Sequence, residues 1–190
     1  MEKSIFITGA GGHGVQSTGK AIAQAAFACG YNVTFSPKYG IEKRGGLSSC
    51  YVVISDEEIG NPRKEKSDIT VIIDKKSFPQ FREDVVPGGI LAVNSSLIED
   101  REYLPGDAKR IDIPFHAIAE EVGSSAFSTL VLGFTAGLTG LFADPEVFTS
   151  YFPKKVRANE ELMELNRRAL LRGWAEAGKV SEKEGTDHES

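Results

Sequence analysis

The stretch SIFITGAGGHGV, residues 4–15, joins a short apolar run to a glycine-rich turn. Residues 4–8 have the β-branched, continuous apolar character of a buried strand. The segment 15–29 that follows the glycines has helical spacing, and Gly30 is placed to end that helix. Because 31–36 alternates like a second strand, the first 36 residues predict a strand–helix–strand unit with parallel strands joined by a right-handed crossover.

The rest of the chain continues the alternation of strands and helices. Further strands are predicted at 49–55, 68–73, 90–93 and 110–113, and helices at 115–122, at 128–141, from Asp144-Pro145 and after Asn159. The predicted fold class is therefore α/β, a Rossmann-like, mostly parallel sheet with helices on both faces. We expect one domain over residues 1–180 and a disordered polar tail over 181–190.

Composition excludes several classes of function. A net charge of -5 on 190 residues argues against non-specific nucleic-acid binding. The longest apolar stretch, 127–142, is short for a bilayer and contains three glycines, so it predicts a buried helix and no membrane span. No signal peptide is visible, which indicates a cytoplasmic protein. Cys29 and Cys50 lack the spacing of a metal or iron–sulfur site, and no catalytic constellation or metal site is evident.

The glycine loop fits the pattern G-x-G-x-x-G between a strand and a helix. Its candidate ligand-binding residues are Gly11, Gly12, His13 and Gly14, because glycine lets a phosphate approach the backbone at a helix N-terminus. A dinucleotide site also needs an acid after the second strand, where this chain has Ser36-Pro37-Lys38. That disfavours NAD but leaves open a self-contained NADP-binding reductase. A tight turn without any ligand is the other alternative.

The segment 37–46 is rich in cations and glycine. Lys38 and Arg44 suit a phosphate or carboxylate, and Gly45 and Gly46 allow the chain to turn sharply beside the guanidinium. These four residues are the second group of candidate binding residues. The alternative is a solvated loop in which Arg44 pairs with Glu42.

Together these segments resemble the gamma subunits of 2-oxoacid:ferredoxin oxidoreductases, the family that acts on pyruvate, 2-oxoglutarate and ketoisovalerate. The resemblance extends over nearly the whole chain except the tail. It rests on GAGGHGV (9–15), YGIEKRGG (39–46), VISDEEI (53–59), PGGILAVNSSLI (87–98) and residues 165–170. The chain departs from the family pattern at His13, Ile41 and Lys43, where the family usually has Gln, Pro and Met.

The resemblance implies a role without a complete active site on this chain. The whole complex converts a 2-oxoacid, coenzyme A and oxidised ferredoxin into acyl-CoA, carbon dioxide and reduced ferredoxin. Thiamine diphosphate, Mg²⁺ and iron–sulfur clusters are then expected on alpha, beta or delta partner subunits, and this chain alone is expected to bind no cofactor. It is expected to help assembly and to help hold coenzyme A, and the motifs lean towards 2-oxoglutarate as substrate. A subunit that works when docked should also expose an apolar contact surface.

Overall fold

The computed structural model describes residues 1–39, 46–103 and 106–186. The strands in these ranges are β1 (Glu2–Ala10), β2 (Asn32–Tyr39), β3 (Leu47–Ser55), β4 (Ser67–Ile72), β5 (Val85–Asn94) and β6 (Lys109–Ile113). The α-helices are α1 (Val15–Ala28), α2 (Phe78–Phe81), α3 (Phe115–Val122), α4 (Phe127–Thr139), α5 (Lys154–Arg157) and α6 (Glu160–Thr186). Two 3-10 helices are η1 (Ser124–Ala126) and η2 (Pro145–Tyr151).

The described strands form one sheet in the order β2-β3-β1-β4-β5-β6. Strand β3 is antiparallel to both of its neighbours, β1 and β2, whereas the β1–β4, β4–β5 and β5–β6 pairs are parallel. All strands except β3 therefore run in the same direction. The predicted α/β class with a mostly parallel sheet is confirmed.

The strand order adds a detail that the local pattern did not give. Strands β1 and β2 are parallel as predicted, and β3 lies between them. The burial of the two strands explains the order. Strand β3 is buried on both faces, as a central strand requires, whereas β2 is partly exposed and contains Pro37, which has no N–H to donate and suits an edge.

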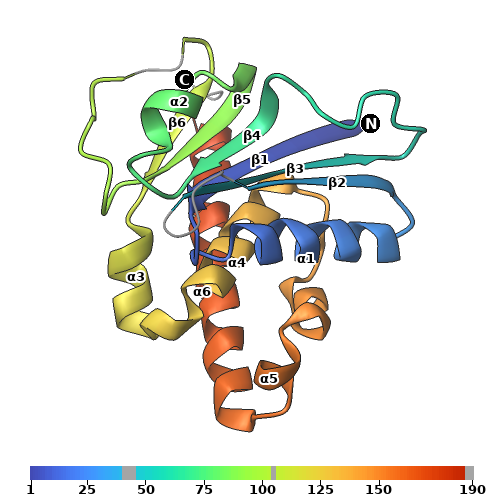
Figure 1. Ribbon diagram of the computed structural model, residues 1–190, viewed down its shortest axis with the longest axis vertical. Helices are drawn as coiled ribbons and strands as arrows, with labels where there is room; N and C mark the ends of the chain where they lie inside the picture. Colours follow the sequence, from blue (N-terminus) through green and yellow to red (C-terminus); the bar gives the residue numbers. More distant parts are fainter. Residues whose placement is uncertain (40–45, 104–105, 187–190) are drawn as a thin grey trace.

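The layers are unequal. Helices α1, α3, α4 and α6 lie on one side of the sheet, and α2 lies on the other (Figure 1). The larger apolar cluster joins the first side to strands β1, β3 and β4, and a smaller cluster around Phe78, Leu91 and Val93 fills the α2 side. Helices thus lie on both faces as predicted, with most of the helical mass on one of them.

Helix ends follow the local signals in the sequence. The Asn159 side chain accepts a hydrogen bond from the backbone N–H of Leu162 at 2.9 Å and caps α6. The Asp144 side chain accepts one from Glu146 N–H at 2.9 Å and caps η2. The backbone of α6 continues to Thr186, into the segment predicted as a disordered tail, and 187–190 lie outside the described residues. Among the described helices, none combines the length and the apolar character that crossing a bilayer requires.

Candidate functional site

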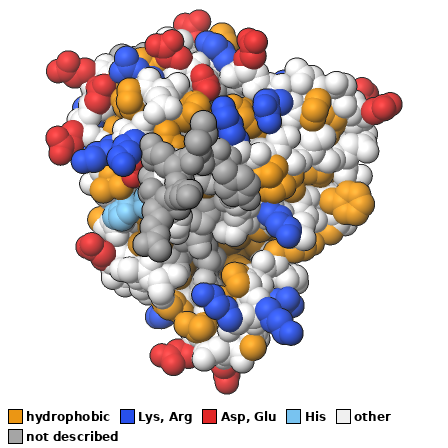
Figure 2. Space-filling view, in the orientation of Figure 1, with side chains coloured by type: hydrophobic (Ala, Val, Ile, Leu, Met, Phe, Trp, Pro, Cys, Tyr) orange, Lys and Arg blue, Asp and Glu red, His pale blue; other side chains and the backbone are white. Residues whose placement is uncertain are grey.

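The sequence motifs converge at one edge of the sheet. Strands β1, β4 and β5 all end there because they are parallel, and the glycine loop 9–14 leaves β1 at this edge. Strand β3 is antiparallel, so its beginning and the end of β2 also reach the same edge. Figure 2 shows Lys and Arg side chains on several sides of the grey, undescribed segment and Asp and Glu side chains mostly towards the rim. Such an arrangement favours anions at this edge.

The glycines of the loop differ in how closely other residues pack around them. Gly14 has φ +74°, and a Cβ there would lie 2.3 Å from Ser128 Cβ at the start of α4. This glycine is therefore required by packing, as the ligand-free alternative supposes. A Cβ on Gly11 would meet Gly46 O at an ordinary 3.5 Å, and one on Gly12, at φ +100°, would meet no atom of the described residues within 4 Å. Packing by the described residues therefore does not require glycine at these two positions, as it does at Gly14.

Hydrogen bonds join the glycine loop to the segment that begins β3. The backbone N–H of Gly11 donates to Gly46 O at 3.0 Å. The side-chain amide of Gln16, in the first turn of α1, donates to Ser48 Oγ at 2.9 Å and to Ser49 O at 2.8 Å, and it lies 3.3 Å from Lys38 O. The two candidate motifs, distant in sequence, therefore lie side by side. Gln16 was not among the predicted site residues, and its place in the first helical turn after the glycines was the available signal.

The cationic residues of the second motif are only partly described. Lys38 is exposed near the end of β2, and its register partner Ser49 is paired with Thr8 of β1. Directly paired residues point to the same face, so Lys38 projects on the α2 side of the sheet, next to the edge. Arg44 and Gly45 lie outside the described residues.

A pair of histidines lies beside the loop. The rings of His13 and His116 are 5.7 Å apart, and both contact Phe127, at 5.4 and 4.6 Å between centroids. His116 Nδ1 lies 2.9 Å from the Asn94 side-chain amide nitrogen, which also donates to Ile73 O at 2.7 Å. That amide is a donor, so His116 Nδ1 accepts and its proton is on Nε2. Sequence spacing gave His116 no partner, and the fold supplies two.

Electrostatics at the pair favour neutral imidazole on His116. Burial lowers the pKa of His116, and the nearby His13 lowers it further. Glu120 and Asp74 act in the opposite direction and raise it. The net lowering shows that desolvation and the second histidine outweigh the two carboxylates at His116.

Buried polar atoms without partners also gather here. Among the described residues, Thr8 Oγ1, His13 Nδ1 and Gln16 Oε1 are buried and make no hydrogen bond. All three come from the end of β1, the glycine loop and the first turn of α1. Buried polar groups are normally satisfied, so a ligand with hydrogen-bonding groups fits this edge.

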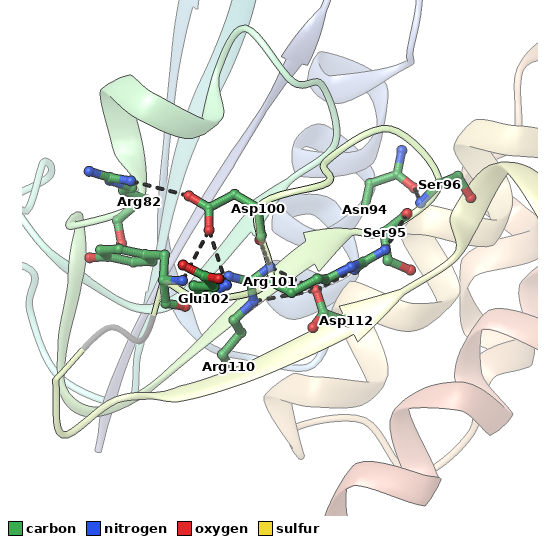
Figure 3. Close-up of polar contacts among 10 residues, drawn as sticks. Arg82, Asn94, Ser95, Ser96, Asp100, Arg101, Glu102, Arg110 and Asp112 are labelled. Atoms are coloured by element: carbon green, nitrogen blue, oxygen red, sulfur yellow. Dashed lines mark hydrogen bonds and ion pairs between the residues drawn. The ribbon is translucent and has the colours of Figure 1, made fainter.

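The segment after β5 is held rigidly against β6 (Figure 3). Arg101 donates to Asp112 Oδ1 at 3.0 Å and to Ser95 O at 2.8 Å. Arg110 donates to the same Asp112 oxygen at 3.0 Å and to Tyr103 O at 2.8 Å. These bonds fix the turn that begins at Asn94, and Asn94 in turn orients His116. In the part of the chain that the structure describes, no group of three or more His, Cys, Asp or Glu side chains is placed to hold a metal ion.

Comparison with known proteins identifies the family. The model of the pyruvate ferredoxin/flavodoxin oxidoreductase family matches residues 4–176. The chain belongs to this family. The resemblance found in the sequence is confirmed. The match gives no support to an NADP-dependent reductase, and β3 separates β1 from β2, the strand whose end would hold the cofactor's 2′-phosphate.

Relatives within the pyruvate ferredoxin/flavodoxin oxidoreductase family differ in length. The chain is 36% identical over 179 residues to the ketoisovalerate oxidoreductase subunit VorA of Methanothermobacter thermautotrophicus, covering 92% of this chain and 36% of that protein. It is 30% identical over 164 residues to the 2-oxoglutarate synthase subunit KorC of Methanocaldococcus jannaschii, covering 85% of this chain and 88% of that protein. The chain thus spans about a third of VorA and most of KorC.

Solved structures of family members have the same fold. The gamma subunit of a keto/oxoacid ferredoxin oxidoreductase from Geobacter sulfurreducens PCA superposes with a TM-score of 0.77 at 28% identity, covering 93% of this chain and 97% of that one. The 2-oxoglutarate:ferredoxin oxidoreductase from Magnetococcus marinus gives a TM-score of 0.84 at 21% identity, covering 94% of this chain and 31% of that one. The second likeness concerns the fold alone.

Proposed function

We propose that this chain is the gamma subunit of a cytoplasmic 2-oxoacid:ferredoxin oxidoreductase complex and that its glycine-loop edge helps to bind coenzyme A. The complex converts a 2-oxoacid, coenzyme A and oxidised ferredoxin into acyl-CoA, carbon dioxide and reduced ferredoxin. Thiamine diphosphate, Mg²⁺ and the iron–sulfur clusters belong to alpha, beta or delta partners. The match to KorC over most of its length supports the role of a separate subunit. Both cysteines are free thiols, as expected in a reducing compartment.

The observation that carries the coenzyme A proposal is the bond between Gly11 N–H and Gly46 O. This bond holds the glycine loop and the start of β3, which follows the cationic segment, at one edge of the sheet. Either segment alone would be a weak site for a phosphate. Coenzyme A presents phosphates, which suit a glycine turn at a helix N-terminus and cations. The N–H groups of Gly11 and His13 are already bonded to Gly46 O and Ala10 O and are not counted as donors to the ligand. Two unpaired atoms could bond to polar groups of the ligand. The Thr8 hydroxyl can donate or accept a hydrogen bond, and Gln16 Oε1 can accept one.

We assign distinct roles to the candidate residues. Gly11 and Gly12 let the ligand approach the backbone, and Gly14 holds the turn against α4. His13 packs against Phe127 beside the loop, Gly46 accepts the Gly11 N–H, and Lys38 projects on the α2 side of this edge. Arg44 and Gly45 complete the set from the sequence pattern.

Reconstitution of the complex tests this function. The chain is co-expressed with the alpha and beta subunits, and acyl-CoA formation is measured with pyruvate, 2-oxoglutarate and ketoisovalerate. The substitution Lys38→Ala should raise the KM for coenzyme A by about tenfold while kcat changes little, because a charge-assisted contact to phosphate is lost. Lys155→Ala on α5, far from this edge, is the matched control and should leave KM unchanged.

Two results would contradict the proposal. A chain that never assembles with alpha and beta subunits is not a gamma subunit. A complex in which Lys38→Ala and Lys155→Ala both retain the normal KM shows a subunit that serves assembly alone.

The isolated chain should bind coenzyme A weakly in calorimetry, in the high micromolar range or about -5 kcal/mol, because partners complete the site. A nanomolar site on the isolated chain would show that partners are not needed.

A further inference from the structure

The outer face of α1 and the edge strand β2 form an apolar groove. Its volume is about 290 Å³. The groove is lined by Lys20, Ala23, Gln24, Phe27, Val33 and Phe35. Phe27 is 73% exposed, an unusual position for a large aromatic side chain on an amphipathic helix. Hydrophobic side chains are also visible over the α1 and β2 side of the face shown in Figure 2.

The core of this chain accounts for only part of the groove: Ala23 belongs to the core and Val33 and Phe35 pack against it, but the exposed Phe27 does not. The buried face of α1, with Val15, Ile22 and Ala26, already packs against the sheet and α4. Phe27 points away from that face, and Val33 and Phe35 are only partly buried because β2 is the edge strand of the sheet that the described residues form. An exposed phenylalanine beside an open sheet edge is a feature of surfaces that bind another protein.

We infer that this groove is a docking surface for a companion chain of the complex, one that inserts an apolar side chain between α1 and β2 and offers a carboxylate to Lys20. The inference rests on the proposed function. Two VorA relatives contain this domain as 36–37% of their length, so the same fold occurs joined to further protein. In a complex whose subunits are separate chains, contacts between this domain and its companions run through its surface.

Charge argues against a second copy of this chain in the groove. A twofold contact would bring the groove of one copy onto the same groove of the other. Lys20 is the charged side chain among the lining residues, and none of them is a carboxylate. Two copies would therefore bury like charges in an apolar contact without a partner, which is costly. A different chain with an acidic residue meets no such cost.

The groove is far from the proposed coenzyme A site. Phe27 lies near the C-terminal end of α1, and the glycine loop precedes the N-terminal end. A helix of 14 residues is about 20 Å long, so substitutions at Phe27 leave the glycine-loop edge intact. Docking and ligand binding can thus be tested separately.

Cys29 provides a native probe for docking. It is an exposed free thiol two positions after Phe27, whereas Cys50 is buried and its burial raises its pKa to about 12. Iodoacetamide should therefore alkylate Cys29 in the folded chain and spare Cys50. In the assembled complex, Cys29 should react about tenfold more slowly than in the isolated chain. An unchanged rate in a complex that is active would overturn the docking surface and leave the proposed function intact.

Substitution tests the same surface. Phe27→Ser should weaken capture of the chain by tagged companion subunits by about tenfold. Leu171→Ser, a matched change at an exposed leucine on α6, should have no effect. Equal capture of Phe27→Ser and wild type, or equal loss in both variants, would overturn the inference. Protection of Cys29 that appears in the isolated chain as its concentration rises would assign the groove to a second copy and also overturn it.

Discussion

Gly11 donates its backbone N–H to the carbonyl of Gly46 at 3.0 Å, and this bond fixes the glycine loop against the start of β3. Gln16 reinforces the junction through Ser48 and Ser49. Both ends of the connection between β2 and β3 are therefore held next to the N-terminus of α1. A site built at this junction depends on contacts that cross from one strand connection to another.

Replacing Gln16 tests how much this junction contributes to stability. Gln16→Leu should lower the free energy of unfolding by about 1–3 kcal/mol, because it removes two hydrogen bonds and leaves buried groups at Ser48 and Ser49 unpaired. Urea denaturation followed by circular dichroism measures the change. Gln80→Leu, whose side chain makes a long 3.4 Å bond to Lys76 O, is the control and should leave the midpoint nearly unchanged. Equal midpoints for the two variants would show that the junction is held by the backbone alone.

The glycines of the loop should not be equivalent. Gly14→Ala combines a positive φ with a 2.3 Å contact to Ser128, so a loss of about 3 kcal/mol is expected. Gly12→Ala has a positive φ but open space around it, and about 1 kcal/mol is expected. Chemical denaturation gives the free energy of unfolding of both variants, and the difference between the two losses is the cost of the steric contact with Ser128. A larger loss for Gly12→Ala would mean that packing against α4 is not the constraint.

Helices α4 and α6 approach each other backbone to backbone. A Cβ at Gly173 would lie 2.1 Å from Leu130 O, and one at Gly133 would lie 2.1 Å from Leu170 O. Gly173→Ala must push the helices apart, so a loss of about 3 kcal/mol or more is expected. Gly178→Ala, on the same helix with open space around it, should instead raise stability by up to about 1 kcal/mol. Thermal unfolding of both variants gives the comparison, and a destabilised Gly178→Ala would contradict it.

Stability should depend on pH through His116. Its folded-state pKa is lowered, mainly by burial and then by His13, so the folded protein binds fewer protons there than the unfolded chain. The contribution is therefore fully present above the unfolded pKa of about 6.5 and is lost as the pH falls below it. Wild type should lose more stability than His116→Gln between roughly pH 7.5 and pH 5.5 in urea denaturation, because this range spans the unfolded pKa of histidine. A parallel loss in both proteins would show that other groups control the acid response.

Local signals predicted the elements of this fold well. The glycine loop between a strand and a helix, the Asn159 and Asp144 caps and the buried helix near 128–141 all appear in the structure. These features depend on residues close together in sequence, where spacing and capping chemistry decide the outcome. The family resemblance was equally accessible, since it rests on ordered motifs along the chain.

Long-range pairing was beyond the reach of such signals. The strand–helix–strand pattern predicted that β1 and β2 are parallel but not which strand lies between them, and β3 takes that place because it can be buried on both faces. His116 was left without a partner, and the fold brought it to Asn94 and His13. Neither contact can be predicted from the spacing of residues along the chain, because each joins segments that follow different strands.

The sequence by itself determined which segments are strands, which are helices and that two glycine-rich motifs belong to one family. Tertiary structure alone decided that these motifs meet through Gly11 and Gly46, and that Phe27 is left exposed beside β2. The physical reason is that secondary structure follows from hydrogen bonds and spacing along the chain. The composition of a site or a docking surface follows instead from which strand ends and helix faces the sheet order places side by side.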